Sequence, residues 1–328
     1  MTVSITLATG RYDRTAALQD GRVRPEGIAL TCLALNVENI FWRMLRHREF
    51  DASELSFGGY VVRRGRGLDD IAAIPVFLSR SFRHSSIYVR RDGEISGPED
   101  LRGRRVGVPE YQMTAAVWVR GILADDFGLL PREVEWVEGG LEEPGRQSAE
   151  PVAPAGVRIV PAPDGRSLSE MLVEGDLDAL VTARTPAVFR RNGGPLVRLF
   201  SEPWVQEREY FRRTGIFPIM HTVGIRREVI DANPWIPQTL YRAFVEAKRL
   251  AQADLIQTSA LPISLPFVLE HTATTEDLMG ADPWPYGLEE NRVTLETFVR
   301  YAVEQGLIAA AMPIEDLFVP STHSTPRI

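Results

Sequence analysis

Cysteine and lysine are scarce in this chain of 328 residues. The single cysteine, Cys32, excludes an internal disulfide, and zinc spacings of the CxxC kind are absent. Its place in the apolar run 28–35 predicts a buried small residue. Lys248 is the only lysine, so arginine supplies the other 36 of the 37 basic residues. Against 44 acidic residues the net charge is −7. That balance argues against a nucleic-acid partner but allows a small anionic ligand in a local basic pocket.

Long hydrophobic runs and leader-like segments are also missing. No apolar run approaches the roughly 18 residues that a membrane helix needs, so we expect no membrane partner. The first ten residues, MTVSITLATG, lack the basic start and apolar centre of a secretion signal. We therefore expect a cytoplasmic protein, provided that no leader preceded this sequence. The sequence also lacks HxH, HExxH and GxGxxG patterns, so we expect neither a bound metal nor a dinucleotide cofactor.

Strand-like and helix-like segments alternate over most of the chain. The 44% hydrophobic and 25% charged residues are those of a globular protein, and the length suggests about two domains. Period-2 and buried apolar runs predict strands at 3–8, 28–35, 52–55, 71–78, 85–89, 105–108, 134–137, 157–160, 178–181, 196–200 and 216–225. Helical spacing predicts helices at 37–48, 58–65, 113–127, 168–174, 186–191, 235–253 and 292–305, with loops at 9–14 and 139–156. The alternation predicts an α/β fold with parallel sheets.

Longer motifs are spread from one end of the chain to the other. They are GRYDRTAAL (10–18), GRVRPEGI (21–28), FWRMLRHREFDASELSFGGY (41–60), IPVFLSRSFRHSSIYV (74–89), PEDLRGRRVGVPE (98–110), GVPEYQMTAAVWVRGIL (107–123), GGLEEPGR (139–146), FPIMHTVGIRRE (217–228) and WPYGLEENRVTLETFVRYAVEQGL (284–307). Together they resemble the 4,5-dihydroxyphthalate decarboxylase family. The order of elements around 98–110 also resembles the type II periplasmic-binding-protein fold.

The resemblance implies a two-lobed architecture with a ligand cleft between the lobes. Each lobe would be a mixed, mainly parallel sheet flanked by helices. Residues 1–90 and 215–328 would form the first lobe, and 91–214 the second. The Pro/Ala/Glu stretch 147–156 departs from the family pattern, and we expect it to decorate a loop.

The resemblance further implies decarboxylation of a hydroxylated aromatic dicarboxylate, with 4,5-dihydroxyphthalate giving 3,4-dihydroxybenzoate (protocatechuate) and CO₂. Each carboxylate of that substrate lies para to a hydroxyl, so the ring itself can store charge and no organic cofactor is required. The site then needs carboxylate anchors, a hydrogen-bond partner for a phenol and a proton donor.

Arginine is the best candidate for the carboxylate anchor because its forked guanidinium group binds two oxygens at once. Arg11 and Arg14 flank Tyr12 in the loop after the first strand, where open α/β sheets bind ligands. Arg80 and Arg83 lie in SRSFRHSS, and we expect at least one of them in the cleft. The alternative for each is an ordinary structural ion pair.

Two histidines and one glutamate are the acid–base candidates. His84 is the first choice because it lies in the RHSS setting beside two arginines, and imidazole exchanges protons near neutral pH. His221 lies in the largely apolar run FPIMHTVGI, so a catalytic histidine and a buried structural histidine are equally compatible with the pattern. Glu54 ends a short strand before Gly58, where it can accept a phenol proton, orient His84 or cap the next helix.

The second lobe supplies a further set of candidates. Tyr111, Gln112 and Thr114 precede a predicted helix, whose free N–H groups favour an anion. Thr182 and Arg184 follow the strand 178–181 in the analogous position, and Arg184 is a candidate for the second anchor.

Three questions stay open at the level of sequence. Tyr286, in the WPY motif, is compatible with an aromatic wall of the cleft and equally with core packing. A solute-binding protein for an aromatic or other organic acid fits the same fold, because fold does not fix function. Association into a homo-oligomer through an exposed apolar patch is compatible with the sequence, which does not locate such a patch.

Overall fold

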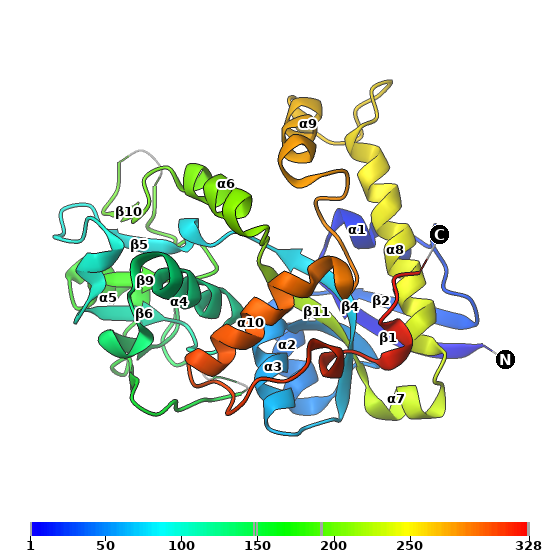
Figure 1. Ribbon diagram of the computed structural model, residues 1–328, viewed down its shortest axis with the longest axis horizontal. Helices are drawn as coiled ribbons and strands as arrows, with labels where there is room; N and C mark the ends of the chain where they lie inside the picture. The colour runs from blue at the N-terminus through cyan, green and yellow to red at the C-terminus, as the bar shows by residue number, and fades with distance from the viewer. Residues whose placement is uncertain (1, 147, 149, 191–192, 327–328) are drawn as a thin grey trace.

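The computed structural model describes residues 2–146, 148, 150–190 and 193–326. The chain forms two lobes, each built on one β-sheet, and they lie side by side with α10 across their junction (Figure 1). The chain is thus the two-lobed α/β protein that the alternation of strands and helices predicts.

The first lobe has a five-stranded sheet with the strand order β2-β1-β3-β11-β4. β1 is parallel to β2 and to β3, whereas β11 runs antiparallel to β3 and to β4. The strands are β1 (Val3–Thr9), β2 (Ile28–Ala34), β3 (Ala52–Ser56), β4 (Ile71–Arg80) and β11 (Ile219–Arg226). The helices are α1 (Asp13–Gln19), α2 (Val37–His47), α3 (Phe57–Gly65), α7 (Arg227–Ala232), α8 (Ile236–Leu255), α9 (Val268–Met279) and α10 (Arg292–Glu304).

The second lobe has a six-stranded sheet with the order β10-β5-β9-β6-β7-β8. β9, β6, β7 and β8 are mutually parallel, and β5 is antiparallel to both of its neighbours. The strands are β5 (Ile87–Arg90), β6 (Arg105–Val108), β7 (Glu135–Glu138), β8 (Arg158–Pro161), β9 (Ala179–Val181) and β10 (Leu196–Arg198). The helices are α4 (Thr114–Phe127), α5 (Leu168–Glu174) and α6 (Pro203–Thr214). Because β5 belongs to this sheet, the chain enters the second lobe before the expected boundary at residue 90.

Short 3-10 helices complete the described secondary structure. They lie at His84–Ser86, Pro98–Leu101, Pro131–Glu133, Glu289–Asn291, Ile314–Leu317 and Pro320–Thr322. Among the described residues, no helix combines the length and the apolar character needed to cross a membrane.

Three differences from the predicted elements have physical causes. The predicted helix at 186–191 is wrong, since 186–190 contain only a turn and residue 191 lies outside the described residues. α1 begins at Asp13, inside the predicted loop 9–14, because Thr15, Ala17 and Leu18 are buried, mainly against α8. α6, α7 and α9 were not predicted, because α6 and α9 have few buried residues and little amphipathic pattern and α7 is only six residues long.

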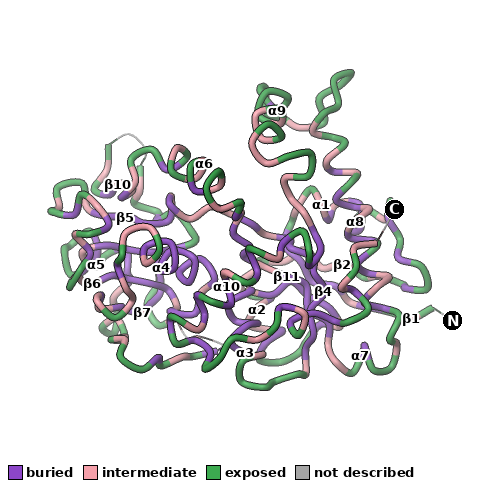
Figure 2. Tube along the Cα trace, in the orientation of Figure 1, coloured by how far each residue is buried: buried purple, intermediate pink, exposed green. Residues whose placement is uncertain are grey.

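One hydrophobic core extends from the first lobe through the junction into the second (Figure 2), and the second lobe has a smaller separate cluster that includes Tyr88, Leu172 and Leu180. Trp118 of α4 is fully buried and its indole N–H donates to the carbonyl oxygen of Ile219 on β11, at 2.9 Å. The Tyr301 ring of α10 packs edge-on against the same indole, and an added Cβ at Gly121 would lie 2.2 Å from that Tyr301 ring. α4 is therefore held rigidly against β11, which fixes its N-terminus relative to the first lobe.

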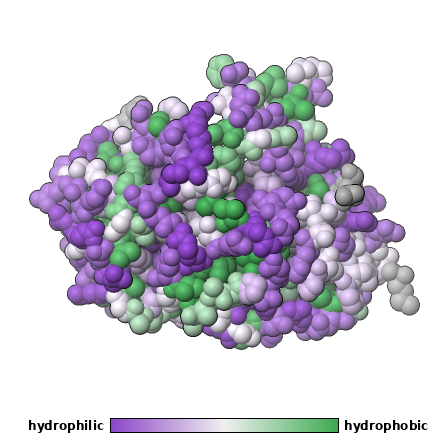
Figure 3. All heavy atoms as spheres, viewed as in Figure 1, coloured by the Kyte–Doolittle hydropathy of each residue, from purple (hydrophilic) through white to green (hydrophobic). Residues whose placement is uncertain are grey.

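α9 and the end of α8 project from the body of the first lobe (Figure 1). Hydrophobic side chains are visible on this projection, although most of the face in Figure 3 is hydrophilic. The exposed large apolar residues of the projection are Ile256, Leu261, Leu265, Phe267 and Leu269.

Candidate active site

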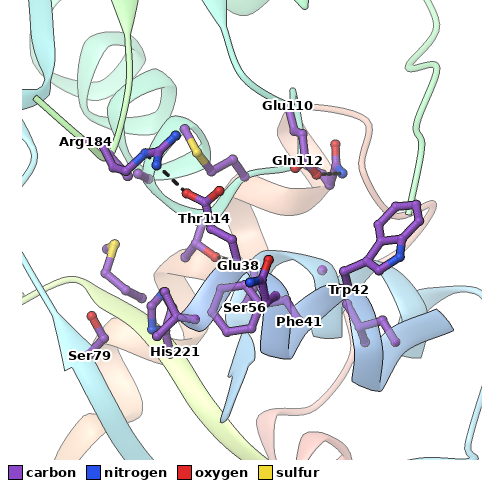
Figure 4. Close-up of a pocket in the computed structure, with 18 of the residues that line it drawn as sticks. Glu38, Phe41, Trp42, Ser56, Ser79, Glu110, Gln112, Thr114, Arg184 and His221 are labelled. Carbon is purple, nitrogen blue, oxygen red and sulfur yellow. Dashed lines mark hydrogen bonds and ion pairs between the residues drawn. The ribbon is translucent and has the colours of Figure 1, made fainter. Parts of the chain in front are cut away.

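A cavity of about 530 Å³ lies between the two lobes (Figure 4). Its first-lobe wall comes from α2, from the end of β3 and from the neighbouring strands β4 and β11. Its second-lobe wall comes from the loop 110–113 and the start of α4, together with positions 146, 150 and 183–184. A volume of this size accommodates a small organic ligand.

A histidine–glutamate pair forms the first-lobe side of this cavity. β11 lies next to β3 in the sheet, with His221 opposite Ser56 and Val223 opposite Glu54. His221 Nδ1 lies 2.6 Å from Oε1 of Glu54. Glu54 is fully buried, whereas His221 lines the cavity with 17% of its side chain exposed. The register of β11 against β4 is irregular on both sides of His221, and such irregularities often re-aim a side chain.

Three hydrogen bonds hold Glu54 as a carboxylate. Besides His221, the Tyr12 hydroxyl donates at 2.6 Å and the Gly10 amide at 2.8 Å. Burial opposes ionisation, but these hydrogen bonds and the charge of His221 outweigh it and lower the Glu54 pKa. Burial, with Glu54 adding to it, raises the Tyr12 pKa, so this phenol keeps its proton. Because the carboxylate only accepts, His221 carries a proton on Nδ1, and Nε2 is its exchangeable nitrogen.

Arg83 contributes a guanidinium group to the cavity wall beside His221. Its Nε donates to the Met220 sulfur at 3.0 Å, and one terminal nitrogen lies 3.5 Å from the Ser86 hydroxyl. Within the described chain, no carboxylate forms a salt bridge with it. Burial lowers its pKa to about 10, so Arg83 remains charged at neutral pH. Glu207 is near enough to act on the charge of Arg83 but forms no salt bridge with it, so the guanidinium group, at the cavity wall, is suited to an anionic ligand.

The two lobes meet at the start of α4. The Thr114 hydroxyl accepts from the Gly58 amide at 2.8 Å and lies 3.0 Å from the Ser56 hydroxyl. A Cβ on Gly58 would lie 2.4 Å from the Gln112 carbonyl oxygen, so only glycine allows this approach. Thr114, Ser56 and Gln112 all line the cavity, which places polar groups of both lobes on its surface.

Charged side chains from both lobes also meet at the cavity wall. Arg146 donates to Glu38 of α2 at 2.9 Å and to Glu110 at 2.8 Å. Arg184 Nε lies 3.4 Å from the other oxygen of Glu38, an ion pair drawn in Figure 4. All four side chains line the cavity. Glu38 comes from the first lobe and both arginines from the second, so these ion pairs join the lobes.

Comparison with curated proteins decides the family. The chain is 38% identical over 327 residues to the 4,5-dihydroxyphthalate decarboxylase of Comamonas testosteroni, covering 99% of each chain. It is 40% identical over 211 residues to the enzyme of the same name from Pseudomonas putida, covering 64% of this chain and 82% of that one. The chain belongs to the 4,5-dihydroxyphthalate decarboxylase family. No protein-family model matches the sequence.

Solved structures show the fold that this decarboxylase family member adopts. The periplasmic aliphatic sulphonate binding protein SsuA of Escherichia coli matches with a TM-score of 0.55 at 12% identity, covering 98% of this chain and 99% of that one. The alkanesulfonate-binding SsuA of Xanthomonas axonopodis, solved with MOPS bound, matches with a TM-score of 0.50 at 13% identity, covering 98% and 97%. At these identities the likeness concerns the fold alone. The predicted two-lobed, type II periplasmic-binding-protein-like fold is confirmed.

Half of the residues predicted from the sequence come together in this family member. Those lining the cavity are Tyr12, Arg83, Gln112, Thr114, Arg184 and His221. Glu54 lies directly behind His221 and orients that histidine. It neither orients His84 nor caps the next helix, which were two of its predicted roles. Those outside the cavity lining are Arg11, Arg14, Arg80, His84, Tyr111, Thr182 and Tyr286.

The first-choice histidine lies away from the cavity. His84 is 4% exposed and packs edge-on against the Phe200 and Tyr210 rings, with centroid distances of 5.5 and 5.3 Å. Burial lowers its pKa to about 4, so it is neutral at pH 7. The RHSS motif put the histidine next to Arg83 in sequence, but the 3-10 turn at 84–86 turns it into the second-lobe core.

The arginines outside the lining have structural partners. Arg80 is buried and donates to the Phe217 carbonyl at 2.9 Å and to the Pro285 carbonyl at 2.7 Å. Arg14 donates to the Leu78 carbonyl at 2.8 Å, with the Tyr12 ring 4.2 Å from its guanidinium carbon. Arg11 is exposed to solvent outside the cavity.

The remaining three candidates are core residues. The Tyr111 ring packs against Trp136 and lies 3.7 Å from the Arg120 guanidinium carbon. Tyr286 is 3% exposed, in agreement with the core-packing alternative. The Thr182 hydroxyl accepts from the Arg184 amide at 3.3 Å, so it shapes the turn that presents Arg184.

Several cavity residues escaped prediction from the sequence. The most important ones are Glu38, Phe41, Trp42, Glu110, Arg146 and Met220. The helix at 37–48 was predicted. Its polar first turn, followed by two aromatic residues, was the signal in the sequence for Glu38, Phe41 and Trp42. Arg146 lies in the irregular loop 139–156, where no periodicity indicates which side chain faces the cleft. Among the residues described, no group of three His, Cys, Asp or Glu side chains is arranged to hold a metal ion.

Proposed function

We propose that this protein decarboxylates 4,5-dihydroxyphthalate to 3,4-dihydroxybenzoate in the cavity between the lobes. Family membership over 99% of the chain supports the reaction. The observation that carries the mechanism is the Glu54–His221 pair, with its Nδ1–Oε1 distance of 2.6 Å and its imidazole at the cavity surface. A cytoplasmic location is part of the proposal.

His221 is the proton donor in this proposal. Glu54 accepts the hydrogen bond from Nδ1–H and orients the ring, so the proton on Nε2 is the one directed to the substrate. The edge of the Phe41 ring packs on the imidazole at a centroid distance of 4.8 Å, which restricts its orientation. Glu54 is thus a positioning residue and His221 the catalytic one.

The chemical step requires one proton and releases CO₂. The hydroxyl para to the departing carboxylate pushes electron density into the ring, and His221 protonates the carbon that bears this carboxylate. The carbon–carboxylate bond then breaks, its electron pair returns to the ring, and aromaticity is restored. His221 regains its proton from solvent, so the balance is one carboxylate and one proton in, one aryl C–H and one CO₂ out.

Two guanidinium groups of the cavity are available for two carboxylates. Arg146 already engages two glutamates, whereas Arg83 has no carboxylate partner and Arg184 only a long contact to Glu38 through Nε. We assign Arg83 and Arg184 as the two carboxylate anchors. Ser56 and Thr114 provide hydroxyls for the ring substituents from opposite lobes.

The test is incubation of the purified protein with 4,5-dihydroxyphthalate, followed by chromatography of substrate and product. We expect 3,4-dihydroxybenzoate to appear in the amount in which substrate disappears. Substrate that binds, by calorimetry, but remains unchanged would instead support the solute-binding alternative. If the protein neither binds nor converts 4,5-dihydroxyphthalate, this family member acts on a different ligand.

A further inference from the structure

Glu38 occupies a central place in the ionic contacts between the lobes. It lies in the first turn of α2, and one of its carboxylate oxygens accepts from Arg146 while the other faces Arg184. Its side chain is 34% exposed and that of Arg146 is 25% exposed, so this contact is partly shielded from water. Neither Glu38 nor Arg146 has a role in the chemical step described above.

Arg146 connects Glu38 to the second lobe. Its Nη1 donates to Glu38 at 2.9 Å, and its other side faces Glu110, with an Nη2–Oε1 distance of 2.6 Å. Both of its neighbours are carboxylates, and their charges, against the opposing effect of burial, raise its pKa. Arg146 therefore forms a fixed bridge between α2 and the loop that precedes α4.

Arg184 is oriented from one side only. Its Nε faces Glu38 at 3.4 Å, and its terminal nitrogens make no hydrogen bond to the residues that the structure describes. Its side chain is 56% exposed, so it has room to turn into solvent once its partner is removed. The Glu38 carboxylate thus contacts both Arg146, which bridges the lobes, and Arg184, the proposed carboxylate anchor.

We infer that Glu38 is the positioning residue that determines the affinity of the cavity for a second carboxylate. Arg146 holds the Glu38 carboxylate in place, and this carboxylate directs Arg184 into the cavity. This rests on the proposed function, in which Arg184 binds one of two substrate carboxylates. Glu38 acts on binding and not on proton transfer, since His221 and Glu54 lie on other elements. Arg83 serves the first carboxylate independently of Glu38.

A second set of contacts keeps the lobes together when Glu38 is changed. Glu150, in the same second-lobe loop as Arg146, pairs with Arg63 on α3 of the first lobe at 2.7 Å and with Arg66, directly after α3, at 2.6 Å. The Glu38→Gln variant therefore keeps its fold, and its thermal unfolding checks this.

The experiment compares ligands with two carboxylates and with one. Dissociation constants for phthalate and for 3,4-dihydroxybenzoate are measured by calorimetry, and kcat and KM with 4,5-dihydroxyphthalate. The variants are E38Q, R146Q and their double mutant, with E49Q as the control. Glu49 follows α2 and pairs with the exposed Arg43, away from the cavity lining.

We expect E38Q to weaken phthalate binding about five-fold, as for a partly exposed ion pair, with kcat within about two-fold of the parent. Affinity for 3,4-dihydroxybenzoate should stay unchanged, because Arg83 binds a single carboxylate. The double mutant should be no weaker than E38Q, because both residues act through the same bridge. E49Q should match the parent.

Several outcomes would overturn the inference. They are unchanged or tighter phthalate binding in E38Q, an equal loss for the one-carboxylate ligand, or additive effects of the two substitutions. If the parent protein decarboxylates its substrate and E38Q binds and reacts as the parent does, this inference is overturned and the proposed function stands. A parent that neither binds phthalate nor decarboxylates overturns the proposed function and the inference with it.

Discussion

His221 Nδ1 and Glu54 Oε1 lie 2.6 Å apart although 167 residues separate them in the sequence. Neighbouring antiparallel strands bring them together, since β11 returns from the second lobe to pair with β3. A buried carboxylate that accepts three hydrogen bonds fixes the imidazole in one orientation at the cavity surface. This relationship makes His221, and not His84, the residue to test first.

Replacing His221 by Gln should abolish most of the turnover. Loss of a general acid typically costs about 10² to 10⁴ in rate, so kcat for 4,5-dihydroxyphthalate should fall by that factor. His271→Gln, on the exposed surface of α9, is the matched control and should retain parental activity. Near-parental turnover in the His221 variant would contradict the assignment of the proton donor.

Replacing Arg83 by Met should separate binding from stability. Loss of this anchor should raise KM for the substrate about ten-fold or more. The fold should not suffer, because Arg83 is partly buried, forms no salt bridge with a described carboxylate, and such a charge contributes little stability. Steady-state kinetics and urea unfolding measure the two effects. Arg212→Gln on the α6 surface, where Arg212 pairs with Glu209, is the control, and an unchanged KM for Arg83→Met would argue against the anchor.

Alanine substitution of the adjacent glycines Gly58 and Gly59 of α3 should have different effects on stability. A Cβ on Gly58 would lie 2.4 Å from the Gln112 carbonyl oxygen, so Gly58→Ala must push the start of α4 away. We expect lower kcat and lower thermal stability. On Gly59 the nearest contact of a Cβ is 3.4 Å, to Leu45, so Gly59→Ala should be neutral or stabilising by about 0.5–1 kcal/mol. Equal melting temperatures for the two variants would refute this view of the lobe contact.

Acid should destabilise the protein partly through His84. Its pKa is about 4 in the folded chain, below the ordinary value of about 6.5, because burial disfavours the charged form. Between these two values the unfolded chain binds the extra proton, so stability falls as pH falls from 6.5 toward 4. The slope from this group is at most about 1.4 kcal/mol per pH unit.

Urea unfolding at pH 7 and at pH 5 measures this contribution. His84→Phe, which keeps an aromatic ring between Phe200 and Tyr210, should lose less stability over that interval than the parent. The exposed His271 again supplies the control, since His271→Gln should follow the parent. Identical losses for the parent and His84→Phe would show that His84 does not titrate in this range.

The sequence by itself determined the fold class and most of the elements. Apolar periodicity located the strands of both sheets and the long helices, because burial of one face is a local property of the sequence. Asn36, a residue type that favours the start of a helix, caps the helix that was predicted at 37–48, and its side chain accepts from the Glu38 amide at 3.0 Å. Long motifs were sufficient to indicate the family, which the curated relatives then established.

The tertiary structure alone decided which polar residues share the cavity. Arg80 and Arg83 are three residues apart, yet one is bound by core carbonyl groups and the other faces the cavity. His84 was the first choice among the histidines in sequence, yet strand pairing placed His221 beside Glu54. Arg146 and Glu38 meet across the cleft from segments without any shared pattern. Such choices depend on contacts between distant segments, and those contacts arise only when both lobes pack into one core.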